Sequence, residues 1–159
     1  MKILKLDARS LLSGAPPFPI NTEVQENVES LVGSHFQFLG EFYEFKKTID
    51  PNNHICLVIL DEKNEIIAYR YFYYESGSNN CELFAVYVAS DYRGQGYAKQ
   101  LFHEALKVAG EAGCKHFIIR FGSPTEERTG LVEYYKKFAS CDSNAMSFSL
   151  YYDSKQYDY

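Results

Sequence analysis

The chain of 159 residues is 46% hydrophobic and 23% charged, which fits one globular domain better than two small domains or a disordered segment. Its formal net charge of −5 lacks the basic surplus of a protein whose main partner is nucleic acid. No apolar run approaches the roughly 18 residues of a membrane span, and charged residues interrupt the start of the chain where a secretory signal would be apolar. We therefore expect a soluble, cytoplasmic protein with no nucleic-acid or membrane partner.

The first third of the chain predicts one strand and two helices. Lys2–Asp7 alternates apolar and polar residues as a short strand does, and a proline-containing loop follows over residues 10–20. Apolar residues at helical spacing begin near Thr22, which forms a capping-box pattern with Gln25. A second helical segment is expected over residues 35–48, where aromatic residues recur at the same spacing.

The centre of the chain changes to a period of two residues, which is typical of strands. Three segments there are rich in β-branched and aromatic residues: Ile55–Leu60, Ile66–Tyr74 and Cys81–Val88. Short turn sequences separate these segments. The simplest arrangement of three consecutive strands with short turns is an antiparallel meander.

A helix and a strand follow the meander. Residues 95–112 carry one apolar stripe, and the polar face opposite includes His103. His116–Phe121 then has the composition of a strand. A helix that connects two strands of one sheet forms a βαβ unit, so Cys81–Val88 and His116–Phe121 should be parallel.

The C-terminal part predicts one more helix and one more strand. Residues 123–126 read Ser-Pro-Thr-Glu, a strong helix start, and the helix should reach Phe138. Residues 145–152 alternate as a last strand, and we expect a flexible tail over residues 154–159. The predicted fold is a single α+β domain over residues 1–153, with flanking helices and a mostly antiparallel mixed sheet that contains one parallel βαβ unit.

The four cysteines show no spacing that indicates a metal site. They form no CxxC pair and have no histidine pair beside them: Cys56, Cys81, Cys114 and Cys141. We interpret them as reduced, small core residues and expect no metal cofactor.

The segment with the strongest chemical signal runs from Glu82 to Ala98. A predicted strand leads into a loop with Gly94 and Gly96, and an amphipathic helix begins directly after it. Glycine allows the backbone to approach a ligand closely, and the free N–H groups at a helix N-terminus favour an anion such as a phosphate. Arg93 would add charge-assisted hydrogen bonds at the rim of such a site.

Two common phosphate-binding loops fit this segment poorly. The dinucleotide-binding pattern needs a small residue where Lys99 stands, and the Gly-Lys-Ser/Thr of a Walker A loop is missing. An ordinary glycine loop that caps a helix remains the plainer alternative for these six residues taken alone.

The segment resembles the acetyl-coenzyme A signature of the GNAT superfamily of N-acetyltransferases, usually written Arg/Gln-x-x-Gly-x-Gly/Ala. Here the signature stands as Arg93-Gly94-Gln95-Gly96-Tyr97-Ala98. Residues 133–138 are similar to the family's FYEKLGF segment, and the order of elements over residues 55–150 follows the family's order.

The resemblance implies that acetyl-CoA is the acetyl donor. In the family, the amides of the signature loop bind the pyrophosphate, and the pantetheine arm runs beside the preceding strand, where Val86 and Val88 would supply backbone hydrogen bonds. A backbone N–H at Tyr87 or Val88 would polarise the thioester carbonyl, an interaction of a kind typically worth about 3 kcal/mol.

The resemblance further implies direct transfer of the acetyl group to a primary amine of a small molecule or peptide in a ternary complex. Tyr135 matches the family's helix tyrosine beside the cofactor sulfur, and a phenol with a pKa near 10 can protonate a departing thiolate. Tyr134 is the adjacent alternative if the register differs by one residue. A core aromatic residue is the other interpretation of Tyr135.

Glu82 is the candidate general base, because many family members carry a glutamate on this strand. Strict alternation would place its side chain on the same face as those of Phe84, Val86 and Val88. An exposed glutamate at a strand end is an equally good interpretation.

Three other residues are weaker candidates. His103 lies on the predicted polar face of its helix and His116 at a strand start, so both are expected to be surface residues. Many relatives have asparagine seven residues before the helix tyrosine, where this chain has Arg128. Arg128 could reach the 3′-phosphate or an acidic acceptor group, although a solvated arginine is the simpler interpretation.

Two other classes of function remain open on the sequence. A catalytically inactive GNAT-fold module would bind CoA or a protein partner without turnover, and a purely structural interaction domain would have no affinity for acetyl-CoA. The sequence does not identify the acceptor amine, and it leaves a monomer and a homodimer equally open.

Overall fold

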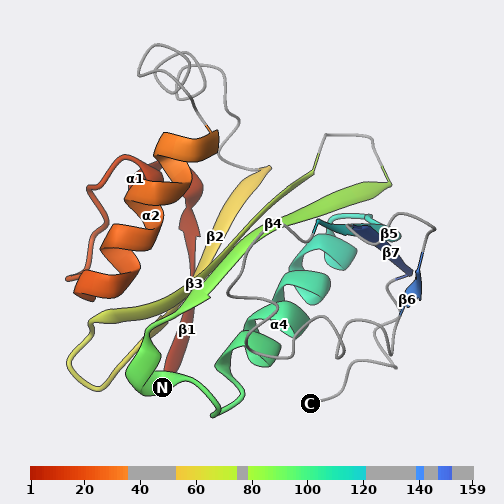
Figure 1. Cartoon of the computed structure of the whole chain (residues 1–159). Helices are drawn as coiled ribbons and strands as arrows, with labels where there is room; N and C mark the ends of the chain where they lie inside the picture. The colour runs from red at the N-terminus through yellow and green to blue at the C-terminus, as the bar shows by residue number, and fades with distance from the viewer. Residues whose placement is uncertain (36–52, 75–78, 121–138, 142–146, 152–159) are drawn as a thin grey trace.

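The computed structural model describes residues 1–35, 53–74, 79–120, 139–141 and 147–151. Within them, seven strands form one sheet in the order β1-β2-β3-β4-β5-β7-β6 (Figure 1). The strands are β1 (Lys2–Asp7), β2 (His54–Leu60), β3 (Ile66–Tyr74), β4 (Asn80–Val88), β5 (His116–Arg120), β6 (Ala139–Cys141) and β7 (Ser147–Tyr151).

Helices cover both faces of this sheet. The helical elements are α1 (Ala8–Leu12), α2 (Thr22–His35), the 3-10 turn η1 (Ser90–Tyr92) and α4 (Tyr97–Glu111). Helices α1 and α2 lie on one face and α4 lies on the other (Figure 1). No described helix combines the length and apolar character needed to cross a membrane.

Strand pairing confirms the predicted fold class. Strands β1 to β4 pair antiparallel in chain order, which confirms the predicted meander. Strands β4 and β5 are parallel and flank α4, as the βαβ prediction requires. Strand β7 pairs antiparallel with both β5 and β6.

The structure departs from the predicted elements in three places. Helix α1 occupies part of the expected loop over residues 10–20, and the three-residue strand β6 was not predicted. Helix α2 starts at Thr22 as expected, but the side chain that caps it is Asn21, whose Oδ1 accepts hydrogen bonds from the N–H groups of Glu23 (2.9 Å) and Val24 (3.4 Å). Of the helix predicted over residues 35–48, only His35 is described, and it is the last residue of α2. The helix predicted over residues 123–138 and the tail over residues 154–159 lie outside the described residues.

The sheet separates two apolar cores. The core under α4 combines side chains of the sheet with the apolar stripe of α4, including Phe102 and Leu106. The core under α1 and α2 is richer in tyrosine, and Tyr69 donates a 2.6 Å hydrogen bond to Oδ1 of Asn27 on α2. This bond ties α2 to the sheet.

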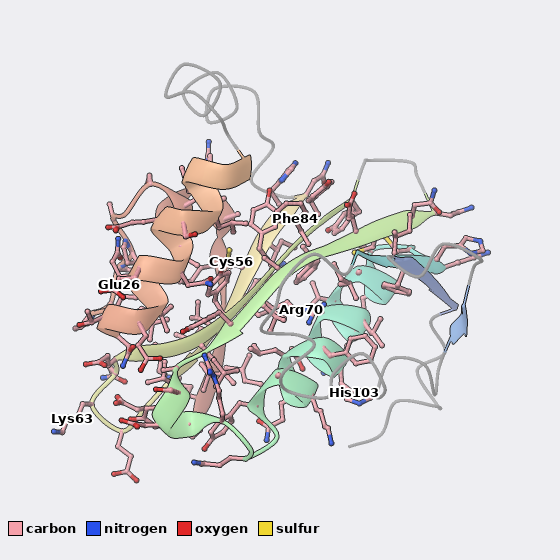
Figure 2. The ribbon with its side chains drawn as sticks, viewed as in Figure 1. Glu26, Cys56, Lys63, Arg70, Phe84 and His103 are labelled. Atoms are coloured by element: carbon pink, nitrogen blue, oxygen red, sulfur yellow. The ribbon has the colours of Figure 1, made fainter. Side chains whose placement is uncertain are left out.

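Two polar side chains are buried on the α4 side. Arg70 on β3 is fully buried, and its guanidinium carbon lies 5.9 Å from the centre of the Phe102 ring (Figure 2). His103 is only 3% exposed, so the prediction that it is a surface residue was wrong. Its helix position is polar by sequence pattern alone, and that pattern does not show the burial of the ring, whose centroid lies 5.3 Å from that of Phe102.

The cysteines agree with the sequence interpretation where their side chains are described. Cys56, Cys81 and Cys114 are buried and have free thiols, and the side chain of Cys141 lies outside the described residues. Burial raises the pKa of the Cys56 thiol. The described residues contain no group of three or more His, Cys, Asp or Glu side chains that could hold a metal ion.

A bulge in β4 changes which side chains share a face. Tyr71 pairs with Ala85 and Phe72 with Leu83, so Phe84 is an extra residue between two pairs. Beyond the bulge, Val86 and Val88 therefore join Leu83 in the core under α4. The expectation that Glu82 shares a face with Val86 and Val88 was wrong, because the extra residue shifts the alternation by one position, whereas Phe84 stays on the face of Glu82.

Candidate cofactor and active site

Strand β4 has two halves with different partners. Residues 81–83 pair with β3 on one side, and residues 80–83 pair with residues 116–119 of β5 on the other. Among the described residues, residues 84–88 pair with β3 alone, so the edge of β4 that faces β5 is open after Leu83. An open strand edge presents N–H and C=O groups that an extended ligand can pair with.

The open half of β4 leads into a loop that requires glycine at two positions. Gly94 has a φ of 76° and Gly96 a φ of 86°, both in the left-handed region that residues with a Cβ rarely adopt. Gly96 is the residue before α4, and no side chain caps the helix there. The first N–H groups of a helix have no partner within the helix, so they are available to a ligand.

A pocket of about 160 Å³ lies at this loop. Six of the nine residues that the sequence predicted to bind the cofactor line it: Val88, Arg93, Gly94, Gly96, Tyr97 and Ala98. Tyr92 and Lys99 complete the lining, whereas the predicted residues Val86, Tyr87 and Gln95 are not part of it. A Cβ added at Gly94 or Gly96 would meet no described atom within 4 Å. The space beside both glycines is therefore open, and the uncapped helix start fits the negative charge of a pyrophosphate.

Arg93 holds the rim of the pocket together. Its Nε donates a 2.9 Å hydrogen bond to the carbonyl oxygen of Val88, the last residue of β4. Its guanidinium carbon lies 5.1 Å from the centre of the Tyr87 ring, which is the geometry of a cation–π contact. The positive charge of Arg93 is thereby fixed beside the glycine loop.

Glu82 lies on the other face of the sheet, in a polar and aromatic cluster. The hydroxyl of Tyr73, its cross-strand neighbour on β3, donates a 2.7 Å hydrogen bond to Oε2 of Glu82. The Tyr73 ring stacks on that of His54 with 4.9 Å between centroids and 14° between planes. Nδ1 of His54 and the hydroxyl of Tyr71 are 2.7 Å apart. Phe84, the bulge residue, packs against Tyr71 with ring centroids 5.6 Å apart.

Of the other predicted candidates, the structure describes the two histidines. His116 is half-buried at the start of β5. Burial lowers the pKa of His103, which favours its neutral form. Tyr135, Tyr134 and Arg128 lie outside the described residues.

The sequence did not indicate that Tyr73 contacts Glu82 or that Glu23 contacts Ser90. Tyr73 reaches Glu82 across a hairpin, so the correct strand register could have indicated the pair. Glu23 on α2 bonds to Ser90 in the turn before the glycine loop, and 67 residues separate the two. No spacing in the sequence signals a contact of that range.

The profile of the Acetyltransferase (GNAT) family matches residues 21–139 of the chain. This chain belongs to the GNAT family. The predicted membership of the GNAT superfamily is thereby confirmed, and the activity of this family is acyl-CoA-dependent acetyl transfer. A comparison with curated proteins by sequence gives no match.

Solved structures of other GNAT proteins share the fold. GCN5 of Tetrahymena has a TM-score of 0.60 at 12% identity, over 97% of this chain and 98% of that chain. A putative acyl-CoA N-acyltransferase of Klebsiella pneumoniae has a TM-score of 0.60 at 13% identity, over 94% of each chain. The PaiA N-acetyltransferase of Thermoplasma acidophilum, solved with coenzyme A, has a TM-score of 0.54 at 16% identity, over 96% of this chain and 100% of that chain. At sequence identities this low, the similarity shows a shared fold and nothing further.

Proposed function

We propose that this protein is an acetyl-CoA-dependent N-acetyltransferase that acts on a primary amine of a small molecule or peptide. One observation carries the proposal: the open half of β4 leads through a left-handed glycine loop directly into an uncapped helix. That arrangement offers a strand edge for an extended arm and helix amides for a diphosphate within one continuous segment. We assign the activity to a single domain over residues 1–153.

The cofactor side of the proposed site is made largely of main-chain groups. The amides of residues 93–98 bind the diphosphate of acetyl-CoA, and Val86 and Val88 pair with its arm. The N–H of Tyr87 or Val88 polarises the thioester carbonyl and stabilises the negative charge that develops on its oxygen. PaiA of Thermoplasma acidophilum, which shares the fold, was solved with coenzyme A, and this supports the choice of cofactor.

The proposed acid–base chemistry uses two side chains. Glu82 accepts the proton that the acceptor amine loses when its nitrogen forms the bond to the acetyl carbon. Tyr135 gives a proton to the CoA thiolate that leaves when the C–S bond breaks. Tyr73 supports this role of Glu82, because its 2.7 Å hydrogen bond holds the carboxylate in one orientation.

The acceptor side of the proposed site is the face of the sheet that carries α1 and α2. Glu82, Tyr73, His54 and Phe84 gather there beside the bulge. A carboxylate among aromatic rings attracts a cationic amine, both by charge and through the ring faces. We therefore expect acceptors that reach the site as cationic amines to be preferred. The attacking nitrogen releases one proton to water before its lone pair can attack the thioester, and Glu82 accepts the second proton as the C–N bond forms.

Calorimetry with acetyl-CoA, followed by an acceptor screen, tests the proposal. The screen covers polyamines, aminoglycosides, amino acids and peptides, and free thiol reports the release of CoA. We expect acetyl-CoA to bind and at least one amine to be acetylated. We expect Glu82→Gln to lower kcat at least 100-fold, because the amide cannot accept the proton.

Glu62→Gln is the matched control, because it removes the same charge from an exposed turn between β2 and β3. Its kcat should equal that of the unmodified protein. Binding of acetyl-CoA without turnover on any amine would instead indicate a catalytically inactive CoA-binding module. Absence of acetyl-CoA binding would reject both enzyme and CoA-binding module.

A further inference from the structure

The turn that precedes the glycine loop is held from a distant part of the chain. Oε2 of Glu23, in the first turn of α2, accepts a 2.8 Å hydrogen bond from the backbone N–H of Ser90. The Ser90 hydroxyl donates a short hydrogen bond to Oε1 of the same carboxylate. Both carboxylate oxygens of Glu23 are thus bonded to η1, which separates β4 from the glycine loop.

The same carboxylate reaches the open half of β4. The Tyr87 hydroxyl donates a 3.3 Å hydrogen bond to Oε2 of Glu23, and the Tyr87 ring carries the guanidinium of Arg93 on its face. Arg93 in turn bonds to the carbonyl of Val88. Glu23 therefore contacts the end of β4 at Tyr87 and the turn η1 at Ser90, the two segments that lead into the glycine loop.

The electrostatics agree with this geometry. The hydrogen bonds from the hydroxyl and the backbone N–H of Ser90 hold the pKa of Glu23 below its usual value, and the charge of Arg93 acts in the same direction. The carboxylate therefore stays ionised at neutral pH. An ionised acceptor makes stronger hydrogen bonds than a neutral one.

Helix α2 has its own attachment to the sheet. Asn27, one turn after Glu23, accepts the 2.6 Å hydrogen bond from Tyr69 on β3. Val24 and Val28 are buried in the core under α1 and α2. The position of Glu23 is thus set by the packing of α2, and loss of its carboxylate should leave the helix in place.

We infer that Glu23 is a positioning residue for the cofactor loop, which fixes the Ser90–Tyr92 turn from α2 and so sets the direction of the amides of residues 93–98. The inference rests on the proposed function, because it assigns those amides to the diphosphate of acetyl-CoA. It also links the two sides of the site, since α2 covers the face of the sheet on which Glu82 lies.

Two measurements on the full chain test the role of Glu23. Amide hydrogen exchange of residues 89–98 in the ligand-free protein reports the order of the loop, and calorimetry gives the Kd of CoA. We expect Glu23→Ala to raise both the exchange rate and the Kd about tenfold. The hydrogen-exchange rates of the α2 amides should not change.

Glu23→Gln is the conservative variant. Its amide can accept from the Ser90 N–H and the Tyr87 hydroxyl and can donate to Ser90 Oγ, so both readouts should stay within about threefold of the unmodified protein. Glu26→Ala removes an exposed glutamate of the same helix (Figure 2) and should change neither readout. Ser90→Ala removes one of the bonds at an exposed site and should give a smaller change in the same direction as Glu23→Ala.

Specific outcomes would overturn the inference. If Glu23→Ala and Ser90→Ala matched Glu26→Ala in both readouts, Glu23 would not position the loop. If Glu23→Gln were as impaired as Glu23→Ala, the hydrogen-bond account would be wrong. If the unmodified protein failed to bind CoA, the proposed function would fail, and hydrogen exchange would still decide whether Glu23 holds the loop.

Discussion

The two halves of β4 differ in what holds them. The first half, residues 80–83, is paired with β5 throughout and with β3 from Cys81 onward, and Cys81 and Leu83 are fully buried there. The second half, residues 84–88, is paired on one side among the described residues, and Val86 and Val88 are 5% and 6% exposed. The first half therefore belongs to the structural core, while the second offers an edge on which a ligand can bind.

The bulge at Phe84 lies where the two halves meet. An extra residue at this point turns the strand and increases its local twist, so the second half cannot continue in register beside β5. It also keeps Val86 and Val88 in the core under α4 while Glu82 and Tyr87 face the other side. One local irregularity thus separates a segment that is paired on both sides from a segment with an open edge.

The largest expected effect is a loss of stability when a side chain in the first half of β4 is truncated. Leu83→Ala should lower the free energy of unfolding by about 3 kcal/mol, because it removes a fully buried side chain and leaves a cavity. Urea denaturation measures the change. The Kd of acetyl-CoA should stay within about twofold, since Leu83 precedes the open edge.

Leu83→Met is the control, because it keeps the side-chain volume and should cost less than about 1.5 kcal/mol. If Leu83→Ala weakened acetyl-CoA binding strongly and left stability unchanged, the division of β4 into a structural half and a binding half would be wrong.

The second largest expected effect is weaker binding of acetyl-CoA when the glycine loop after β4 is changed. Gly96→Val should raise the Kd of acetyl-CoA about 100-fold, because valine disfavours the φ of 86° and its side chain would enter the open space of the pocket. Calorimetry measures the loss. Gly113→Val, at a glycine with a φ of 101° after the end of α4, imposes comparable backbone strain outside the loop.

Both glycine variants should lower stability by a similar amount, and Gly96→Val alone should lose the cofactor. Equal Kd values for the two variants would show that strain anywhere in the α4 region, and not the shape of the loop, limits binding.

The smallest predicted effect comes from removal of the Tyr73 hydroxyl that donates a hydrogen bond to Glu82. Tyr73→Phe keeps the ring that stacks on His54 and removes only the hydroxyl that bonds Glu82, so kcat should fall about fivefold. Steady-state CoA release measures this change. Tyr69→Phe is the same substitution on the same strand and removes the bond to Asn27. It should cost about 1 kcal/mol of stability and leave kcat unchanged.

The sequence by itself determined the central strands of the sheet and the position of the glycine loop. The period of two residues located β2, β3 and β4 to within one residue of their observed bounds, and the order of strand, helix and strand determined that β4 and β5 are parallel. Gly94 and Gly96 were recognisable because glycine lets the backbone approach a ligand closely, and the structure adds that both adopt a left-handed φ, which residues with a Cβ rarely do. Such features depend on neighbours in the chain, so a local pattern records them.

Only the tertiary structure decided which side chains meet. The bulge at Phe84 reversed the predicted face of Val86 and Val88, because strand register depends on the partner strand and not on the strand alone. Burial of His103 depends on what packs over α4, and the bond from Ser90 to Glu23 joins residues 67 positions apart. Contacts of this kind arise when separate elements pack together, and they leave no periodic trace in the sequence.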